Sequence, residues 1–191
     1  MNRELIINVS KSEITIALAE DKRLVELGKE SVKNGFSVGD IYLGRVRKIM
    51  PGLNAAFVNI GHEKDAFIHY LDLGPQFGSL QKLMGQLTGA KKKNVQFDTF
   101  KLEQPIGKTG KISNLLTTGQ PIVVQIAKEA ISTKGPRLTS DISLAGRNVV
   151  LIPFSNKISI SQKIRSAEER KRLKKIALSI LPKNYGVIIR T

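Results

Sequence analysis

The stretch that decides the fold is IYLGRVRKIMPGLNAAFVNIGHEKDAFIHY, residues 41–70. Three β-rich runs follow one another in it, and a Pro-Gly pair and a Gly-His pair separate them as turns. Together with two later runs, the predicted strands lie at 41–49, 55–60, 66–68, 122–126 and near 138–142. Five short strands in a segment of this size are typical of a small closed barrel of the OB type, which we predict for residues 37–140.

The segments on either side of this barrel also carry β-rich runs. Residues 1–36 hold three of them, at 5–9, 14–18 and 23–27, with polar turns between. This pattern indicates a β-meander. Three short strands are marginally stable alone, so we expect the meander to dock onto something else.

Residues 141–191 predict a small α/β region. Its strands are expected at 149–152, 158–161 and 186–190. Ser166 is the expected N-cap of a helix, and Glu169 three residues later predicts a capping box. Apolar residues fall on one face of this helix: Leu173, Ile176, Ala177, Ile180 and Leu181. The predicted fold class is mainly β with some α: a five-stranded OB-type barrel between an N-terminal meander and a partial α/β region.

The charge of the chain is strongly positive, with 31 Lys and Arg against 16 Asp and Glu and a formal net charge of +15. Residues 1–36 hold six basic and six acidic side chains, residues 37–140 fourteen and seven, and residues 141–191 eleven and three. Such a surplus favours a polyanionic partner, because bound phosphates release their counterions. We expect nucleic acid to contact the middle and the end of the chain. A solvated basic surface is the alternative.

Several other classes of protein are disfavoured by composition. The chain has no Cys, which excludes disulfides and thiolate metal sites. No apolar run approaches the roughly 18 residues of a membrane span, and the N-terminus lacks the features of a signal peptide. A cytoplasmic protein is the default expectation. Only His62 and His69 offer imidazole, and we find no metal-type cluster, phosphate-binding glycine loop, nucleophile elbow or carboxylate pair of the magnesium-binding type.

The strand pattern lapses between Leu73 and Gly119, where glycines and prolines indicate a long, mobile insertion at about 74–118. Apolar residues at helical spacing predict a short helix inside it: Leu80, Leu83, Met84 and Leu87. A run of three lysines at 91–93 either lies in a solvated loop or contacts RNA.

The candidate binding residues lie on the predicted barrel. Phe57 and Phe67 each stand on a strand close to basic residues, such as Arg45 and Arg47 on the preceding strand. Aromatic rings on the surface of an OB barrel stack successive bases, whereas the alternative for both rings is packing in the core. Lys128 and Lys134 are further candidates for phosphate contacts.

The same strings resemble the S1 domain of the RNase E/G endoribonucleases. The match rests on IYLGRV at 41–46, PGLNAAFVNIG at 51–61 and AFI at 66–68. It continues through VVQI at 123–126, KG at 134–135, LT at 138–139, ISLAG at 142–146 and GVIIRT at 186–191. The resemblance thus covers nearly the whole chain apart from the insertion, which is longer than the family leads us to expect.

The resemblance implies a role for each segment. Residues 1–36 would begin an RNase H-like subdomain, residues 37–140 would be the S1 domain, and residues 141–191 would begin a sensor of the RNA 5′ end. Phe57, Phe67, Lys128 and Lys134 match family positions that hold single-stranded RNA. Gly146, Val150, Arg190 and Thr191 match those that bind a 5′-monophosphate, and a guanidinium with a hydroxyl suits phosphate oxygens.

The resemblance also implies a longer protein, an endoribonuclease of RNA processing and decay. Its two magnesium-binding aspartates would lie beyond Thr191, so residues 1–191 are expected to bind RNA without cutting it. No catalytic or metal-binding residue is therefore assigned to them, and magnesium is expected only for the longer protein. The zinc-binding Cys pair that the family uses for oligomerisation is not here, and a homo-oligomer stays open for the longer protein.

Two other interpretations remain. The chain could be a stand-alone S1-type RNA-binding module without nuclease activity, although an apolar strand ending at Arg190-Thr191 favours continuation. It could also be a structural piece whose basic face meets an acidic protein. Exposure of Phe57 and Phe67 would argue against this last interpretation.

Overall fold

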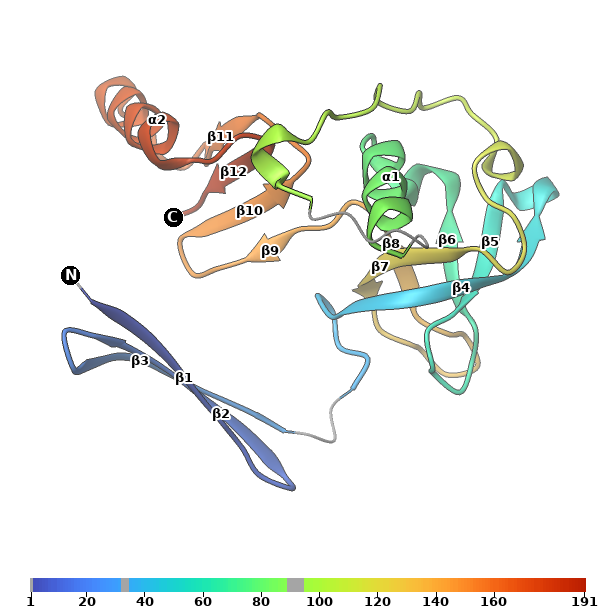
Figure 1. The fold of residues 1–191 in the computed structure, drawn as a ribbon, viewed down its shortest axis with the longest axis horizontal. Coiled ribbons are helices and arrows are strands. Elements are labelled where there is room, and N and C mark those ends of the chain that lie inside the picture. Colours follow the sequence, from blue (N-terminus) through green and yellow to red (C-terminus); the bar gives the residue numbers. More distant parts are fainter. Residues whose placement is uncertain (1, 32–34, 89–94) are drawn as a thin grey trace. The chain divides into compact units, whose positions relative to one another are not determined.

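The computed structural model describes residues 2–31, 35–88 and 95–191. The chain divides into two compact units, Met1–Ser37 and Val38–Thr191. Figure 1 shows the order of the elements along the chain, and each unit is described by itself.

The first unit is a three-stranded antiparallel meander of β1 (Arg3–Val9), β2 (Glu13–Glu20) and β3 (Arg23–Ser31), paired in sequence order. The predicted meander is confirmed, with longer strands than the apolar runs suggested. Ser10 closes the first turn, because its Oγ accepts from the backbone N–H of Glu13 at 3.0 Å. Among the described residues of this unit, Ala19 alone is buried. A single sheet with both faces exposed buries too little apolar surface to be stable alone.

The second unit contains a closed barrel of five strands, in the order β4-β5-β6-β8-β7. The strands are β4 (Ile41–Met50), β5 (Ala55–Asn59), β6 (Ala66–His69), β7 (Pro121–Lys128) and β8 (Arg137–Thr139). Neighbouring strands are antiparallel except β6 and β8, which are parallel. The predicted OB-type barrel is therefore confirmed, and its fifth strand lies at the start of the region in which it was expected.

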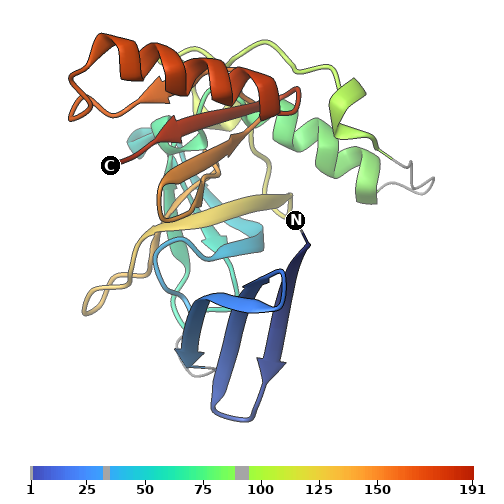
Figure 2. The same ribbon diagram turned by 90° about the vertical axis from the view of Figure 1, so that its left-hand side faces the viewer.

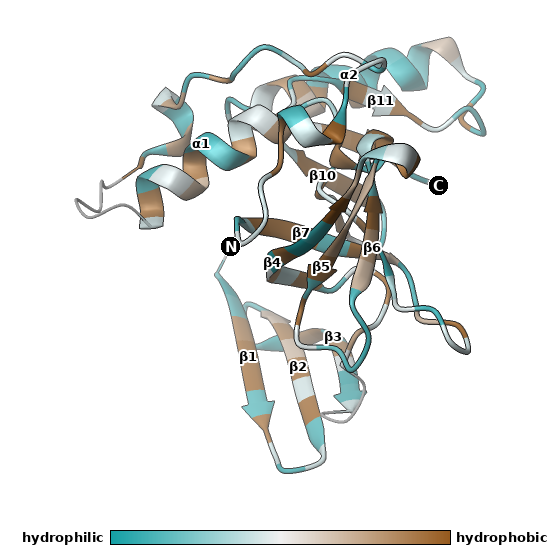
Figure 3. Cartoon of the chain, turned by 90° about the vertical axis from the view of Figure 1, so that its right-hand side faces the viewer, coloured by the Kyte–Doolittle hydropathy of each residue, from teal (hydrophilic) through white to brown (hydrophobic). Residues whose placement is uncertain are grey.

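Along each barrel strand, every second side chain points inward, and these side chains fill the barrel interior. Ala56 and Val58 on β5, and Ala66 and Ile68 on β6, are completely buried. Figure 3 shows how hydrophobic residues dominate β5 in particular. Because side chains alternate along a strand, the residues between these positions point outward. This alternation sets which side chains can meet a ligand.

The described parts of the insertion between β6 and β7, residues 74–88 and 95–118, pack against the rest of the unit, which differs from the mobile segment expected there from the sequence. Helix α1 (Phe77–Thr88) confirms the predicted helix. Further along, Ile112 and Leu116 are almost fully buried. Asn54 fixes the return of the insertion: its Nδ2 donates to the Gly110 carbonyl at 3.0 Å, and its Oδ1 accepts from the Ile112 N–H at 2.7 Å. The lysine run at 91–93 lies outside the described residues.

A second sheet follows the barrel, in the order β11-β12-β10-β9. Its strands are β9 (Leu144–Ala145), β10 (Val149–Pro153), β11 (Ile158–Ile160) and β12 (Tyr185–Ile189). Helix α2 (Ala167–Ile180) connects β11 to β12, which run parallel. Figure 2 shows α2 running along these strands. The predicted α/β region is therefore present.

Helix α2 departs from its prediction in two details. Ser166 does cap it, with Oγ accepting from the Glu169 N–H at 3.3 Å. The Glu169 carboxylate, however, binds the Arg172 guanidinium at 2.6 and 2.7 Å instead of closing a capping box. In the predicted apolar stripe only Ala177 is buried, while Ile180 is 73% exposed. None of the helices in the described ranges has the length and apolar character to cross a membrane.

The insertion also attaches the second sheet to the barrel. The ring of Phe97 lies 5.1 Å from that of Phe154 and 4.7 Å from that of Tyr185, measured between centroids. The buried Asn184 amide donates to the carbonyls of Phe97 and Phe100, both at 2.8 Å. The structure thus assigns the insertion a bracing role, because it fixes the second sheet relative to the barrel.

Candidate nucleic-acid interface

Five outward-facing residues form one continuous row across all five barrel strands. Strand register pairs Lys48 with Phe57, Phe57 with Phe67, Phe67 with Arg137, and Arg137 with Lys128. Paired residues on adjacent strands point to the same side of a sheet. All five side chains are exposed or half-exposed. We call these five residues the barrel row.

The two aromatic rings stand at the centre of the barrel row. Phe57 and Phe67 are directly opposite each other on β5 and β6, with ring centroids 6.0 Å apart and ring planes at 70°. Both rings are half-exposed, so the expected placement on one outer face is confirmed, and burial in the core is excluded. Rings at this angle form a corner, with the edge of one ring directed at the other.

Cations stand on both sides of the ring pair, and two backbone bulges determine which basic side chains occupy these positions. The register of β4 shifts between Val46 and Lys48, which leaves Arg47 out of the pairing and puts Lys48 opposite Phe57. A bulge of this kind re-aims the side chains that follow it. A second shift on β7 aligns Lys128 with Arg137. Beside the row, Arg45, Arg47 and Asn59 help to line a groove of about 400 Å³.

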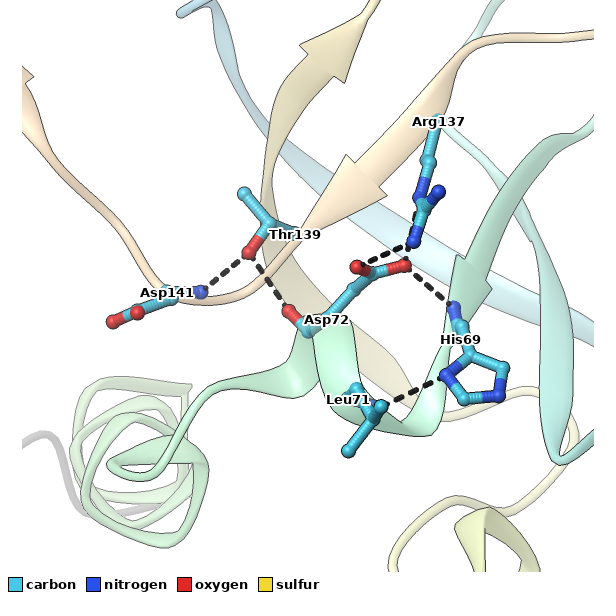
Figure 4. Close-up of polar contacts among 6 residues, drawn as sticks. All are labelled: His69, Leu71, Asp72, Arg137, Thr139 and Asp141. Atoms are coloured by element: carbon cyan, nitrogen blue, oxygen red, sulfur yellow. Dashed lines mark hydrogen bonds and ion pairs between the residues drawn. The ribbon is translucent and has the colours of Figure 1, made fainter. Parts of the chain in front are cut away.

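Arg137 of the barrel row is held by an ion pair with Asp72. Its Nε donates to Asp72 Oδ2 at 3.0 Å and its Nη2 to Asp72 Oδ1 at 2.9 Å, as Figure 4 shows. These hydrogen bonds, followed by the charge of the same carboxylate, raise the pKa of the Arg137 guanidinium. Two parallel bonds fix the plane of the guanidinium as well as its position.

Lys134 lies away from the barrel row. It sits in the β7–β8 loop, where its backbone N–H and carbonyl pair with those of Ile131. The next residue, Gly135, packs so closely on the Asp65 carbonyl that a Cβ would lie 2.2 Å from that oxygen. Lys134 is exposed, so a phosphate contact by this side chain stays a prediction. Such a contact would be made from the β7–β8 loop, outside the barrel row.

The four residues expected to bind a 5′-phosphate meet at one end of the second sheet. Val150 on β10 pairs with Ile188 on β12, so the two strands lie side by side as expected. One step further, the Arg190 N–H donates to the Asn148 carbonyl at 2.7 Å. Gly146 closes the β9–β10 hairpin, with its N–H donating to the Val149 carbonyl at 2.8 Å. Thr191 follows Arg190 directly and is exposed.

A groove of about 860 Å³ runs between the barrel and this end of the second sheet. It is lined by Gly39, Gln125 and Ala127 on the barrel side and by Leu144, Gly146 and Val149 on the other. The buried Gln125 fixes its floor, because the amide donates to the carbonyls of Gly39 and Ser143, both at 2.8 Å. The groove therefore extends from Ala127, next to Lys128, to Gly146, one of the four expected phosphate-binding residues.

The histidines have local structural roles. His62 Nδ1 accepts from the Lys64 N–H at 3.0 Å, and His69 Nδ1 accepts from the Leu71 N–H at 3.1 Å, so each closes a tight turn. Within residues 2–31, 35–88 and 95–191, no group of three or more His, Cys, Asp or Glu side chains is arranged to hold a metal ion. We assign no catalytic step to these residues.

Comparison with known proteins finds similar sequences in one family. A sequence model described as "Ribonuclease E/G family" matches residues 143–191. Ribonuclease G of Haemophilus influenzae is 40% identical over 188 residues, which cover 98% of this chain and 34% of that protein. Ribonuclease G of Escherichia coli strain K12 is 37% identical over 191 residues, covering 100% of this chain and 35% of that protein. Over its whole length the chain is similar to proteins of the ribonuclease E/G family.

Ribonuclease E of a Nostoc species is 39% identical over 155 residues, which cover 81% of this chain and 19% of that protein. The chain thus spans about a third of the length of the ribonuclease G relatives that it matches. The family-model match coincides with β9 to β12, the sheet that carries Gly146, Val150, Arg190 and Thr191.

Sequence reasoning missed two members of the barrel row. Lys48 was hidden because simple alternation along β4 does not anticipate the bulge at Arg47. Arg137 stands between the buried residues Pro136 and Leu138. The change from apolar to charged to apolar at residues 136–138 was a usable signal for an outward-facing Arg137. It is weak because β8 is three residues long, and the parallel pairing of β8 with β6 has no local sequence pattern.

Proposed function

We propose that this chain holds single-stranded RNA across its barrel row and binds the RNA 5′-monophosphate at the end of its second sheet. In a longer protein it would form the RNA-binding part of an endoribonuclease of RNA processing and decay. Hydrolysis, with the magnesium that the resemblance implies, is proposed for that longer protein.

The observation that carries the proposal is the exposed ring pair with cations on either side. Half-exposed aromatic rings offer stacking surfaces, and Lys48 and Lys128 at the two ends of the row offer charge to the phosphates. Bases must be unstacked to reach such rings, which favours a single strand over a duplex. The corner between Phe57 and Phe67 suits one base at a time.

The groove beside the barrel supports the proposal for the 5′ end. It leads from Ala127, next to Lys128, to Gly146. Arg190 follows Ile188 by two residues, so alternation puts its side chain on the same face as those of Ile188 and Val150. RNA held on the barrel row and lying in this groove would reach Gly146, which directly follows the β9 residue paired with Val150.

A binding and integrity assay tests the proposal. A labelled single-stranded RNA and the same RNA annealed into a duplex are titrated with the chain at about 0.1 M salt, with and without Mg²⁺. We expect tighter binding of the single strand, and we expect the RNA to stay intact on a gel. Equal binding of the duplex would contradict the proposed mode of binding. RNA cleavage that persists through purification would contradict the assignment of hydrolysis to the longer protein.

A further inference from the structure

Arg137 differs from the other cations of the barrel row in how firmly it is held. Its side chain is 46% exposed, whereas that of Asp72 beneath it is 19% exposed. Asp72 itself is fixed on two sides. Its carboxylate accepts from the His69 N–H at 3.2 Å, and its carbonyl accepts from Thr139 Oγ1 at 2.7 Å and from the Ser140 N–H at 2.8 Å.

The ion pair leaves part of the guanidinium available. Nε and Nη2 of Arg137 are bound to Asp72, while Nη1 has no hydrogen-bond partner in the part of the chain that the structure describes. Register places Arg137 between Phe67 and Lys128, one strand spacing of roughly 4.8 Å from each. A base stacked on Phe67 therefore brings its backbone next to a guanidinium of fixed orientation.

We propose that Arg137 binds the RNA phosphate next to the base held by the Phe57–Phe67 corner, and that Asp72 is the residue that positions it. Arg suits this role because its planar fork can hold a carboxylate on one edge and a phosphate oxygen on another. The inference rests on the proposed RNA-binding function of the barrel row. It adds a phosphate-binding residue and the carboxylate that orients it.

The rival explanation is an ordinary surface ion pair. The chain offers a matched example in Arg172 and Glu169 on α2, which pair through the same two nitrogens at 2.7 and 2.6 Å. Exposed pairs of this kind contribute little to stability. The two pairs differ in their surroundings, because Arg137 lies in register with a stacking ring and Arg172 lies on a solvated helix face.

The first experiment compares Arg137→Gln with Arg172→Gln, two substitutions that remove the same charge. Binding of a single-stranded RNA is measured at several salt concentrations. One phosphate contact on a single strand contributes about 0.7 to the slope of log K against log salt, which corresponds to about fivefold in affinity at 0.1 M salt. We expect Arg137→Gln to lower the salt slope by about 0.7 and the RNA affinity about fivefold. We expect Arg172→Gln to leave the slope and the affinity unchanged. Equal effects of the two substitutions would overturn the proposal.

The second experiment tests the positioning role of Asp72. Asp72→Asn makes the chain more positive, so RNA should bind more tightly if Asp72 has no role in orienting Arg137. If Asp72 positions Arg137, the variant should bind RNA at least twofold more weakly and with a smaller salt slope. The thermal midpoint of each variant shows whether the fold is retained, and Asp72→Glu, which keeps the charge, replaces Asp72→Asn if it is not. Tighter binding by a folded Asp72→Asn variant, or unchanged binding by a folded Asp72→Glu variant, overturns the positioning role.

Failure of this inference and failure of the proposed function give different results. If the unsubstituted chain does not bind single-stranded RNA, or binds it independently of Phe57 and Phe67, the proposed function fails and takes the inference with it. If RNA binding depends on both rings but keeps its full salt slope in Arg137→Gln, only the inference fails.

Discussion

Replacing both Phe57 and Phe67 with alanine should remove most of the affinity of the chain for single-stranded RNA. Base stacking on an aromatic ring is worth about 1–3 kcal/mol, so we expect each single substitution to weaken binding by roughly five- to 150-fold. The rings lie 6.0 Å apart and share one corner, so the double variant should lose less than the two single losses combined. Titration of a labelled RNA, followed by fluorescence polarisation, measures all three losses.

Leu53→Ala is the matched control for this experiment. Leu53 is an apolar side chain between β4 and β5 that is 58% exposed and stands outside the barrel row. Its removal should leave RNA affinity unchanged. A double Phe variant that keeps the circular dichroism spectrum of the parent and binds RNA as tightly would contradict the stacking role of the rings.

Arg190→Gln should abolish the preference for RNA with a 5′-monophosphate over RNA with a 5′-hydroxyl. Hydrogen bonds to a charged group contribute about 1.5–3 kcal/mol, which corresponds to a preference of roughly ten- to 150-fold. We expect this preference to be clear in a protein that continues past Thr191. It should be weak in residues 1–191 alone, because a terminal carboxylate on Thr191 would repel the phosphate.

Competition between the two RNAs measures the preference, in the longer protein and in its Arg190→Gln variant. Arg165→Gln is the control, because Arg165 is exposed and lies outside the four expected phosphate-binding residues. Equal use of both RNAs by the unsubstituted longer protein would contradict the 5′-phosphate assignment. The RNA-binding role of the barrel row would be unaffected by that result.

Local patterns were sufficient to predict the barrel and its ring pair. The β-rich runs around Phe57 and Phe67 predict the strands, and the basic residues on the neighbouring strand favour outward rings over the alternative of packing in the core, which the structure then excludes. The helical spacing in residues 77–88 likewise predicts α1. Each of these signals lies within a few residues of the feature that it predicts.

Contacts between distant residues could not be predicted in the same way. Asn54 binds backbone groups more than 50 residues away, and Asn184 binds carbonyls more than 80 residues away, so no periodicity marks either asparagine. These two side chains and the ring cluster around Phe97 hold the described part of the insertion, which was predicted to be mobile, against the barrel and the second sheet. The stripe on α2 shows the opposite error, because amphipathic spacing does not guarantee burial of residues such as Ile180.

Tryptophan fluorescence tests most directly whether RNA lies on the barrel row. The chain has no Trp, so Phe67→Trp introduces a single indole at the proposed stacking position, and Leu53→Trp introduces one on the barrel outside the row. We predict that single-stranded RNA quenches the emission of the Phe67→Trp variant with the same Kd as that measured by polarisation, and leaves the emission of the Leu53→Trp variant nearly unchanged. Saturating RNA binding without quenching in the Phe67→Trp variant, or equal quenching in both variants, would contradict the account.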